Sequence, residues 1–176
     1  MENNLSLEFE KVFNQKPQHH FFCPGRVNLI GEHIDYNGGK VLPCAVTLGT
    51  HLLIAPNNDN VLRFSSLNFE ETAEVPVKDS YSKQGKDWYN YPLGVINFLG
   101  LNQKQGYDLL YYGNIPTGSG LSSSASIEVL TAFAFNELYK ADISKLDLVK
   151  IAKRAENEFI GVNCGIMDQF GVAFGE

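Results

Sequence analysis

The chain reads Asn114-Ile115-Pro116-Thr117-Gly118-Ser119-Gly120-Leu121-Ser122-Ser123-Ser124-Ala125-Ser126 where a predicted strand at 107–112 gives way to a predicted helix at 123–139. Glycines let the backbone pass close to a bulky ligand, and the free N–H groups at a helix start favour phosphate. The Gly-Lys-Ser/Thr ending of a Walker A loop is missing, and Ser123 replaces the third glycine of a dinucleotide-binding motif. The stretch predicts a phosphate cradle of another type, the alternative being a polar turn that caps a helix.

Apolar periodicity places the other elements on either side of this stretch. Helical spacing predicts helices at 4–13, 88–99 and 144–159, the last capped by Ser144 and Asp147. Short apolar runs between Gly, Pro and Asn-rich breaks predict strands, which lie at 20–23, 41–46, 51–55, 61–65 and 69–77. A last apolar run at 170–176 resembles a strand separated from its neighbours, which suggests a chain cut from a longer protein. Without linkers or repeats, the sequence predicts one continuous α+β unit.

The composition is that of a soluble globular protein, with 44% hydrophobic and 19% charged residues. No stretch approaches the roughly 18 apolar residues that span a bilayer, and the first residues are unlike an export signal. The net charge of −6, without a Lys/Arg cluster, argues against nucleic acid as a partner. The three cysteines, Cys23, Cys44 and Cys164, form no C-x-x-C pair and are interpreted as reduced thiols. We therefore expect a cytoplasmic protein.

A second polar stretch reads Pro24-Gly25-Arg26-Val27-Asn28-Leu29-Ile30-Gly31-Glu32-His33-Ile34-Asp35-Tyr36-Asn37-Gly38-Gly39. It predicts a glycine-punctuated loop with many hydrogen-bonding side chains of different geometry. Such a set suits a sugar, because each buried hydroxyl needs a donor and an acceptor. Glu32, His33 and Asp35 match no zinc-ligand spacing, and His33 by itself could be a structural or surface histidine.

A third stretch, Gly161-Val162-Asn163-Cys164-Gly165-Ile166-Met167-Asp168-Gln169-Phe170, places a single acid in an apolar, glycine-broken loop. A buried carboxylate is either paired with a cation or used as a base, because an unpaired buried charge is costly. Arg26 is the candidate partner of Asp168. The alternative is an aspartate that caps a helix or a turn.

The predicted cradle lacks a lysine, so triphosphate charge must be met by a metal ion and by basic groups from elsewhere. Ser123 could supply a hydroxyl and Glu156 a carboxylate, although Glu156 could also be a solvated helix charge. Glu158 competes with Glu156 for this role. The two lie about 200° apart around a helix, so at most one of them faces inward.

In this order, the three stretches resemble the galactokinases, which are members of the GHMP family of small-molecule kinases. Residues 25–37 are similar to the galactose-binding pattern that separates galactokinases from mevalonate and homoserine kinases. Residues 116–126 resemble the family's ATP loop, and residues 164–169 the loop that carries the catalytic acid. The family fold has an N-terminal α+β domain, with a mixed sheet and packed helices, and a C-terminal ferredoxin-like domain. The resemblance implies that residues 1–176 are the N-terminal galactose- and ATP-binding domain alone.

The resemblance implies phosphorylation of galactose at its C1 hydroxyl by ATP, giving galactose 1-phosphate and ADP in the first committed step of the Leloir pathway. It also implies Mg²⁺ as the cofactor, a cytoplasmic location and a monomer at full length. Asp168 would accept or orient the C1 hydroxyl proton, while Arg26 would keep Asp168 ionised and stabilise charge on the transferring phosphoryl group. The other implied ligands are Glu32, His33, Ile34, Asp35 and Gly165 for the sugar, Thr117, Gly118, Ser119, Gly120, Leu121, Ser122 and Ser123 for ATP, and Ser123 and Glu156 for the metal.

Two departures from the family pattern bear on these expectations. Ile34 stands where the family commonly has Thr, and the family's second half, with its glycine-rich third motif and a sugar-contacting tyrosine, is missing. Three alternatives therefore stay open: a galactose- and ATP-binding sensor without turnover, an N-acetylgalactosamine kinase, and an inert fragment of the enzyme. The uninterrupted serine run at 122–124 and the presence of Asp168 argue against the sensor.

Overall fold

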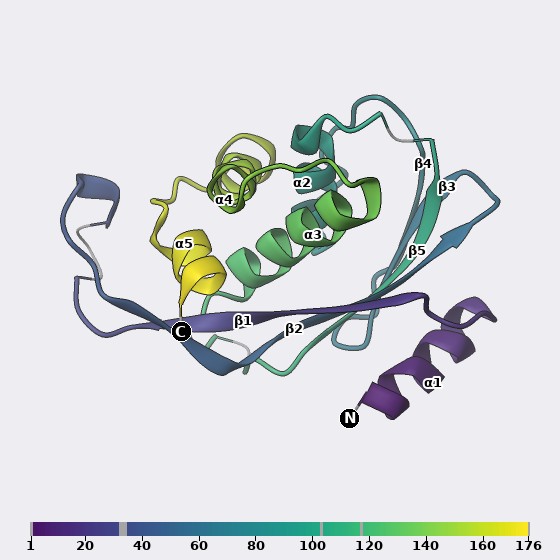
Figure 1. Cartoon of the computed structure of the whole chain (residues 1–176), viewed down its shortest axis with the longest axis horizontal. Helices are drawn as coiled ribbons and strands as arrows, with labels where there is room; N and C mark the ends of the chain where they lie inside the picture. Colours follow the sequence, from purple (N-terminus) through teal and green to yellow (C-terminus); the bar gives the residue numbers. More distant parts are fainter. Residues whose placement is uncertain (1, 32–34, 103, 117, 176) are drawn as a thin grey trace.

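The structure is a computed structural model that describes residues 2–31, 35–102, 104–116 and 118–175 (Figure 1). The strands among these residues are β1 (His19–Asn28), β2 (Pro43–Asn57), β3 (Val61–Ser66), β4 (Ala73–Pro76) and β5 (Gly106–Gly113). The helices are α1 (Glu2–Phe13), α2 (Asn90–Leu99), α3 (Ser123–Tyr139), α4 (Lys145–Arg154) and α5 (Met167–Phe174). A short 3-10 turn spans Asp35–Asn37, and a π-helical turn, Ala155–Ile160, continues α4. No described helix is long and apolar enough to cross a membrane.

The five strands form one mixed sheet in the order β1-β2-β5-β3-β4. Every neighbouring pair is antiparallel except β3 and β5, which run parallel. Helices α2 to α5 cover one face of the sheet, and α1 packs on the opposite face (Figure 1). The arrangement is an α+β fold with a mixed sheet and packed helices, as the sequence predicts.

Side-chain alternation along β2 divides the core between the two faces of the sheet. Leu52 belongs to the main cluster, which lies under α2 to α5. Leu53 and Ala55 point the other way and pack with Phe9 of α1 in a smaller cluster. Strand β5 is covered on both faces, so its sequence is nearly continuously apolar and does not alternate between apolar and polar residues.

Several predicted elements are confirmed. The predicted helix at 123–139 coincides with α3, and the predicted strand at 107–112 lies within β5. The hydroxyl of Ser144 accepts a hydrogen bond of 3.2 Å from the Asp147 N–H, which confirms the predicted cap of α4. The local sequence pattern therefore suffices to predict these segments.

Other predictions are wrong in ways that matter for the site. The final apolar run forms the end of helix α5, not a strand, and its Phe170 and Phe174 rings stack one turn apart with centroids separated by 4.6 Å. Strand β1 continues to Asn28, so Arg26 lies on a strand rather than in a loop. The predicted strands at 41–46 and 51–55 are one strand, β2, whose long pairing with β1 bridges the Gly49 break.

Candidate functional site

The site is centred on an ion pair between Arg26 of β1 and Asp168 of α5, residues that lie 142 positions apart. The Arg26 guanidinium donates to Asp168 Oδ1 from Nη2 at 2.5 Å and from Nε at 3.0 Å. Arg26 is buried, whereas about a third of the Asp168 side chain is exposed. Asp168 stands in the first turn of α5, where the helix dipole favours a carboxylate. The predicted pairing of these two residues is confirmed, and the carboxylate keeps access to solvent.

The serine-rich loop is attached to the same arginine. Arg26 Nη1 donates to the Gly120 carbonyl at 2.7 Å, and the Arg26 backbone N–H donates to the Leu121 carbonyl at 3.1 Å. Gly25 allows this approach, because a Cβ there would lie 2.7 Å from the Leu121 oxygen. The loop is thus fixed to β1 by both backbone and side chain.

The loop and the start of α3 surround a cavity of about 300 Å³ that Arg26 and Asp168 also line. Gly118 and Gly120 have φ of +74° and +70°, a left-handed conformation that glycine adopts without strain. Ser123 is exposed at the first position of α3, where backbone N–H groups are unsatisfied and the dipole favours anions. The predicted ATP ligands Gly118, Ser119, Gly120, Leu121, Ser122 and Ser123 all line this cavity, and Thr117 lies outside the described residues.

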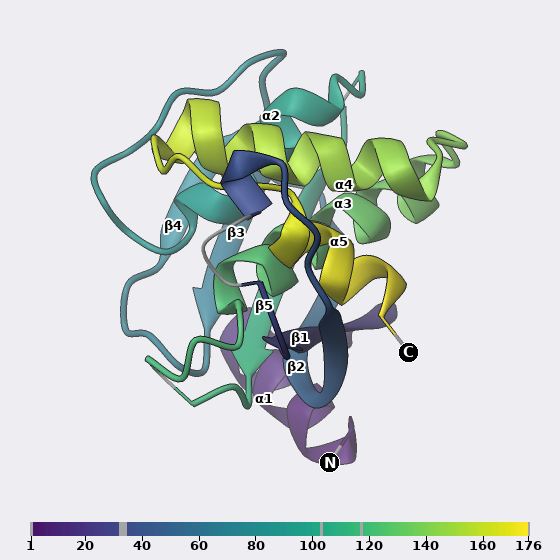
Figure 2. The same ribbon diagram turned by 90° about the vertical axis from the view of Figure 1, so that its left-hand side faces the viewer.

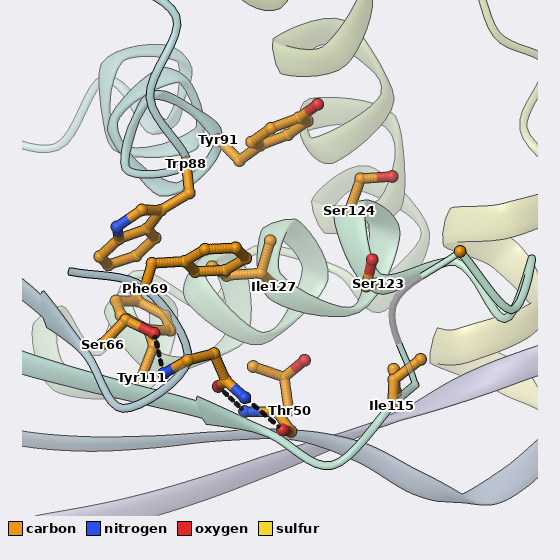
Figure 3. A pocket seen from close by; sticks show the side chains of 13 residues that line it. Thr50, Ser66, Phe69, Trp88, Tyr91, Tyr111, Ile115, Ser123, Ser124 and Ile127 are labelled. Atoms are coloured by element: carbon orange, nitrogen blue, oxygen red, sulfur yellow. Dashed lines mark hydrogen bonds between the residues drawn. The ribbon is translucent and has the colours of Figure 1, made fainter. Parts of the chain in front are cut away.

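An aromatic pocket of about 210 Å³ adjoins the loop cavity and shares Ile115, Gly118, Ser123 and Ser124 with it (Figure 3). The Phe69 and Trp88 rings line this pocket and stack on each other nearly parallel, with centroids 6.2 Å apart. The remaining lining residues are Thr50, Ser66, Asn68, Tyr91, Tyr111, Gly113 and Ile127. An apolar, aromatic-lined pocket next to an anion cradle fits a nucleotide base and its phosphates.

Asn68 holds one wall of this aromatic pocket in place. Its side-chain amide donates to the Gly113 carbonyl at 2.8 Å and accepts from the Gly113 N–H at 2.7 Å. The two bonds resemble the paired backbone hydrogen bonds between neighbouring β-strands, and they fix the 66–69 segment to the end of β5. Sequence reasoning missed the aromatic residues of this pocket, because it placed Phe69 and Trp88 only as the first residues of a predicted strand and a predicted helix.

Glu128 of α3, Glu156 of the π-helical turn and Gln169 of α5 form a buried cluster. Gln169 Nε2 donates to Glu156 Oε2 at 2.5 Å and lies 3.5 Å from Glu128 Oε2. Burial, followed by the charge of Glu156, raises the pKa of Glu128 well above its ordinary value. Burial and the Glu156 carboxylate likewise raise the pKa of the Cys164 thiol to about 12.

Glu156 satisfies part of what the predicted metal site requires. It is buried in the π-helical turn after α4, whereas Glu158 is exposed and pairs with Arg154 at 2.9 Å, so only one of the two faces inward. No group of three or more His, Cys, Asp or Glu that could hold a metal ion occurs among the described residues. Mg²⁺ is commonly held by one or two carboxylates together with phosphates and waters, and a lone Glu156 is compatible with that chemistry. Ser124 is a second hydroxyl beside Ser123 at the two cavities, which the sequence reasoning missed.

The two described residues of the predicted sugar site lie against each other. Asp35 Oδ2 accepts a hydrogen bond of 3.0 Å from the Met167 N–H, which brings the 35–37 turn onto the start of α5 (Figure 2). A Cβ at Gly165 would lie 2.8 Å from Asp35 Oδ1 and still closer to its Cγ and Oδ2. A residue with a Cβ fits at this position only if the Asp35 carboxylate moves. Glu32, His33 and Ile34 lie outside the described residues.

Two family descriptions match the chain. The description "GHMP kinases N terminal domain" matches residues 90–176, and "Galactokinase galactose-binding signature" matches residues 7–56. The galactokinase of Clostridium beijerinckii is 50% identical over 179 residues, covering 99% of this chain and 46% of the relative. That of Streptococcus thermophilus is 51% identical over 178 residues, covering 98% and 46%.

Solved structures give the same assignment. The crystal structure of Lactococcus lactis galactokinase complexed with galactose matches with a TM-score of 0.93 and 41% identity, covering 99% of this chain and 47% of that one. Methanococcus jannaschii mevalonate kinase matches with a TM-score of 0.78 at 21% identity, which shows the shared fold alone. The chain spans about half the length of the curated relatives it matches. In sequence and in fold, the chain belongs to the GHMP kinase family, among its galactokinases.

Proposed function

We propose that this chain supplies the N-terminal galactose- and ATP-binding domain of a galactokinase, which transfers the γ-phosphate of ATP to the C1 hydroxyl of galactose. The products would be galactose 1-phosphate and ADP, the first committed step of the Leloir pathway. The observation that carries the proposal is the Arg26–Asp168 pair at the edge of the phosphate-loop cavity. It puts an acid and a cation where an anionic substrate and a hydroxyl could meet.

In this proposal, ATP lies along the two adjoining cavities. The base occupies the aromatic pocket that Phe69, Trp88 and Tyr111 line, and the phosphates lie against the N-terminus of α3. Asp168 orients or accepts the proton of the galactose C1 hydroxyl, and Arg26 balances charge on the phosphoryl group. Phosphoryl transfer has a loose transition state, so positioning and electrostatics contribute more than a strong base does.

Mg²⁺ would be held by Glu156 together with a serine hydroxyl of α3, Ser123 in the sequence-based proposal. When bound, it would neutralise charge on the β- and γ-phosphates. The amide of Gln169 already orients Glu156 Oε2 in the structure. Glu156 therefore has a fixed direction before any ligand arrives.

The galactose site would combine Asp35 and Gly165 with Glu32, His33 and Ile34. Asp35 is fixed by the Met167 N–H, one residue before Asp168, so sugar binding and the acid share one short segment. We propose that the remaining walls come from a C-terminal domain, and that the full-length protein is a cytoplasmic monomer without nucleic-acid partners. The isolated 176-residue chain would then bind its substrates weakly and turn over slowly or not at all.

The decisive experiment is ADP release with Mg·ATP and galactose, glucose or N-acetylgalactosamine, using this chain and the same chain extended to its natural C-terminus. We expect galactose-dependent ADP from the extended protein. In that protein, Asp168→Asn should lower kcat by about 10²- to 10⁴-fold with a much smaller change in KM. The exposed Asp142→Asn makes the same chemical change outside the site and should leave kcat unchanged.

Each other outcome selects an alternative. Binding of galactose and ATP without ADP release would support a regulatory sensor and refute the kinase. A preference for N-acetylgalactosamine would replace galactose as the substrate. An unchanged kcat in Asp168→Asn would remove Asp168 from the chemical step.

A further inference from the structure

The Asp168 carboxylate has a third donor besides the two from Arg26. Ser122 Oγ donates to Asp168 Oδ2 at 2.6 Å, while both arginine bonds go to Oδ1. An ionised carboxylate offers roughly four acceptor positions, so three donors leave about one for an incoming hydroxyl. The serine fixes the oxygen that the arginine does not hold.

The backbone of Ser122 shows that this contact has a conformational cost. Ser122 has φ +56° and ψ +55°, the left-handed region, which Gly118 and Gly120 also occupy in the same loop. Glycine would adopt that conformation without strain, whereas a residue with a Cβ is destabilised by about 1 kcal/mol or more. Ser122 precedes α3, where a serine hydroxyl commonly caps the helix, but it makes no side-chain cap. Its hydroxyl turns to Asp168 instead.

We propose that Ser122 is a positioning residue, which fixes the orientation of the Asp168 carboxylate relative to the phosphate loop. This inference rests on the proposed kinase function and assigns the Ser122 hydroxyl to the acid rather than to the ATP phosphates. Arg26 completes the connection, because it bonds Asp168 on one side and the Gly120 carbonyl on the other. The loop that holds phosphate and the acid that meets the sugar hydroxyl therefore move as one unit.

The test compares Ser122→Ala with Ser122→Gly in the protein extended to its natural C-terminus. Both variants lack the hydroxyl, but only glycine removes the backbone strain. We expect kcat to fall about ten- to a hundredfold in both, the loss typical of one hydrogen bond to a charged group, with KM for ATP and galactose within about threefold. In the 176-residue chain, Ser122→Gly should nevertheless melt about 2–4 °C above Ser122→Ala.

Lys140→Gly is the matched control, because Lys140 also has a left-handed backbone, at φ +49°, but ends α3 far along the chain from the loop. It should raise the melting temperature and leave kcat unchanged. A kcat that recovers in Ser122→Gly, or that stays within about twofold of wild type in both Ser122 variants, would overturn the proposal. The first result would show that the backbone conformation of residue 122, not its hydroxyl, affects kcat. The second would show that residue 122 has no effect on kcat.

A second readout does not depend on activity. Thermal unfolding of the 176-residue chain is measured for Ser122→Ala, Asp168→Ala and the double variant. We expect Ser122→Ala to lower the melting temperature in the wild-type background and to have less than half that effect when Asp168 is absent. Equal effects in both backgrounds would refute the hydrogen bond itself. If the wild-type protein releases no galactose-dependent ADP, the kinase function fails while this coupling remains measurable.

Discussion

Replacing Gly165 by alanine should damage the sugar side of the site more than its small size suggests. The added Cβ would lie 2.8 Å from Asp35 Oδ1 and still closer to Oδ2 and Cγ, nearer than real Cβ atoms approach a neighbour. Asp35 must therefore swing away, which breaks its 3.0 Å bond to the Met167 N–H at the start of α5. A hydrogen bond to a charged group contributes about 1.5–3 kcal/mol, so Gly165→Ala should destabilise the fold by a similar amount.

For a chain of this length, that destabilisation corresponds to a fall in melting temperature of about 3–12 °C, measurable by circular dichroism or scanning calorimetry. Asp35→Ala is the matched second variant, because it removes the clash together with the bond. In the Asp35→Ala background, Gly165→Ala should cost under about 0.5 kcal/mol. A single Gly165→Ala variant that melts within 1 °C of wild type would refute the steric argument, and so would additive effects in the double variant.

Two further perturbations address the acid cluster and the aromatic pocket. Burial and the nearby Glu156 charge raise the pKa of Glu128 in the folded protein. A carboxyl group of this kind contributes its full stabilisation only at a pH below its unfolded-state pKa, and this contribution is lost as the pH rises through its folded-state pKa. Glu128→Gln should therefore flatten the decline of the melting temperature as the pH rises above about 4, the ordinary pKa of a glutamate, and an unaltered decline would contradict the assignment. Trp88 is the chain's one tryptophan and borders the pocket beside Phe69, so ADP should change its fluorescence, and saturating ADP without any change would exclude the pocket as the base site.

Charge and motif arguments were sufficient to predict the centre of the site. The Arg26–Asp168 pairing follows from the cost of an unpaired buried carboxylate, and the loop before α3 follows from its glycines and serines. Helix geometry predicted only that at most one of Glu156 and Glu158 faces inward, and the family resemblance, not the residue pattern, selected Glu156.

The features that were missed depend on contacts between distant segments. Phe69 and Trp88 are 19 positions apart and become a pocket only when the 66–69 segment is fixed to Gly113 by Asn68. The final run of the chain was mistaken for a strand because eight residues carry too little periodicity to separate the two structures. Nothing local shows that the Ser122 hydroxyl would bond an acid 46 positions away.

The position of α1 has a practical consequence for binding assays. The helix packs by Phe9 against Leu53 on the sheet face that α2 to α5 leave open, and its Lys11 side chain is 69% exposed (Figure 1). None of its residues lines the loop cavity or the aromatic pocket. A biotin or a sensor-chip linker on Lys11 would therefore attach the protein through the α1 face of the sheet, and the loop cavity and the aromatic pocket would stay open to the solution.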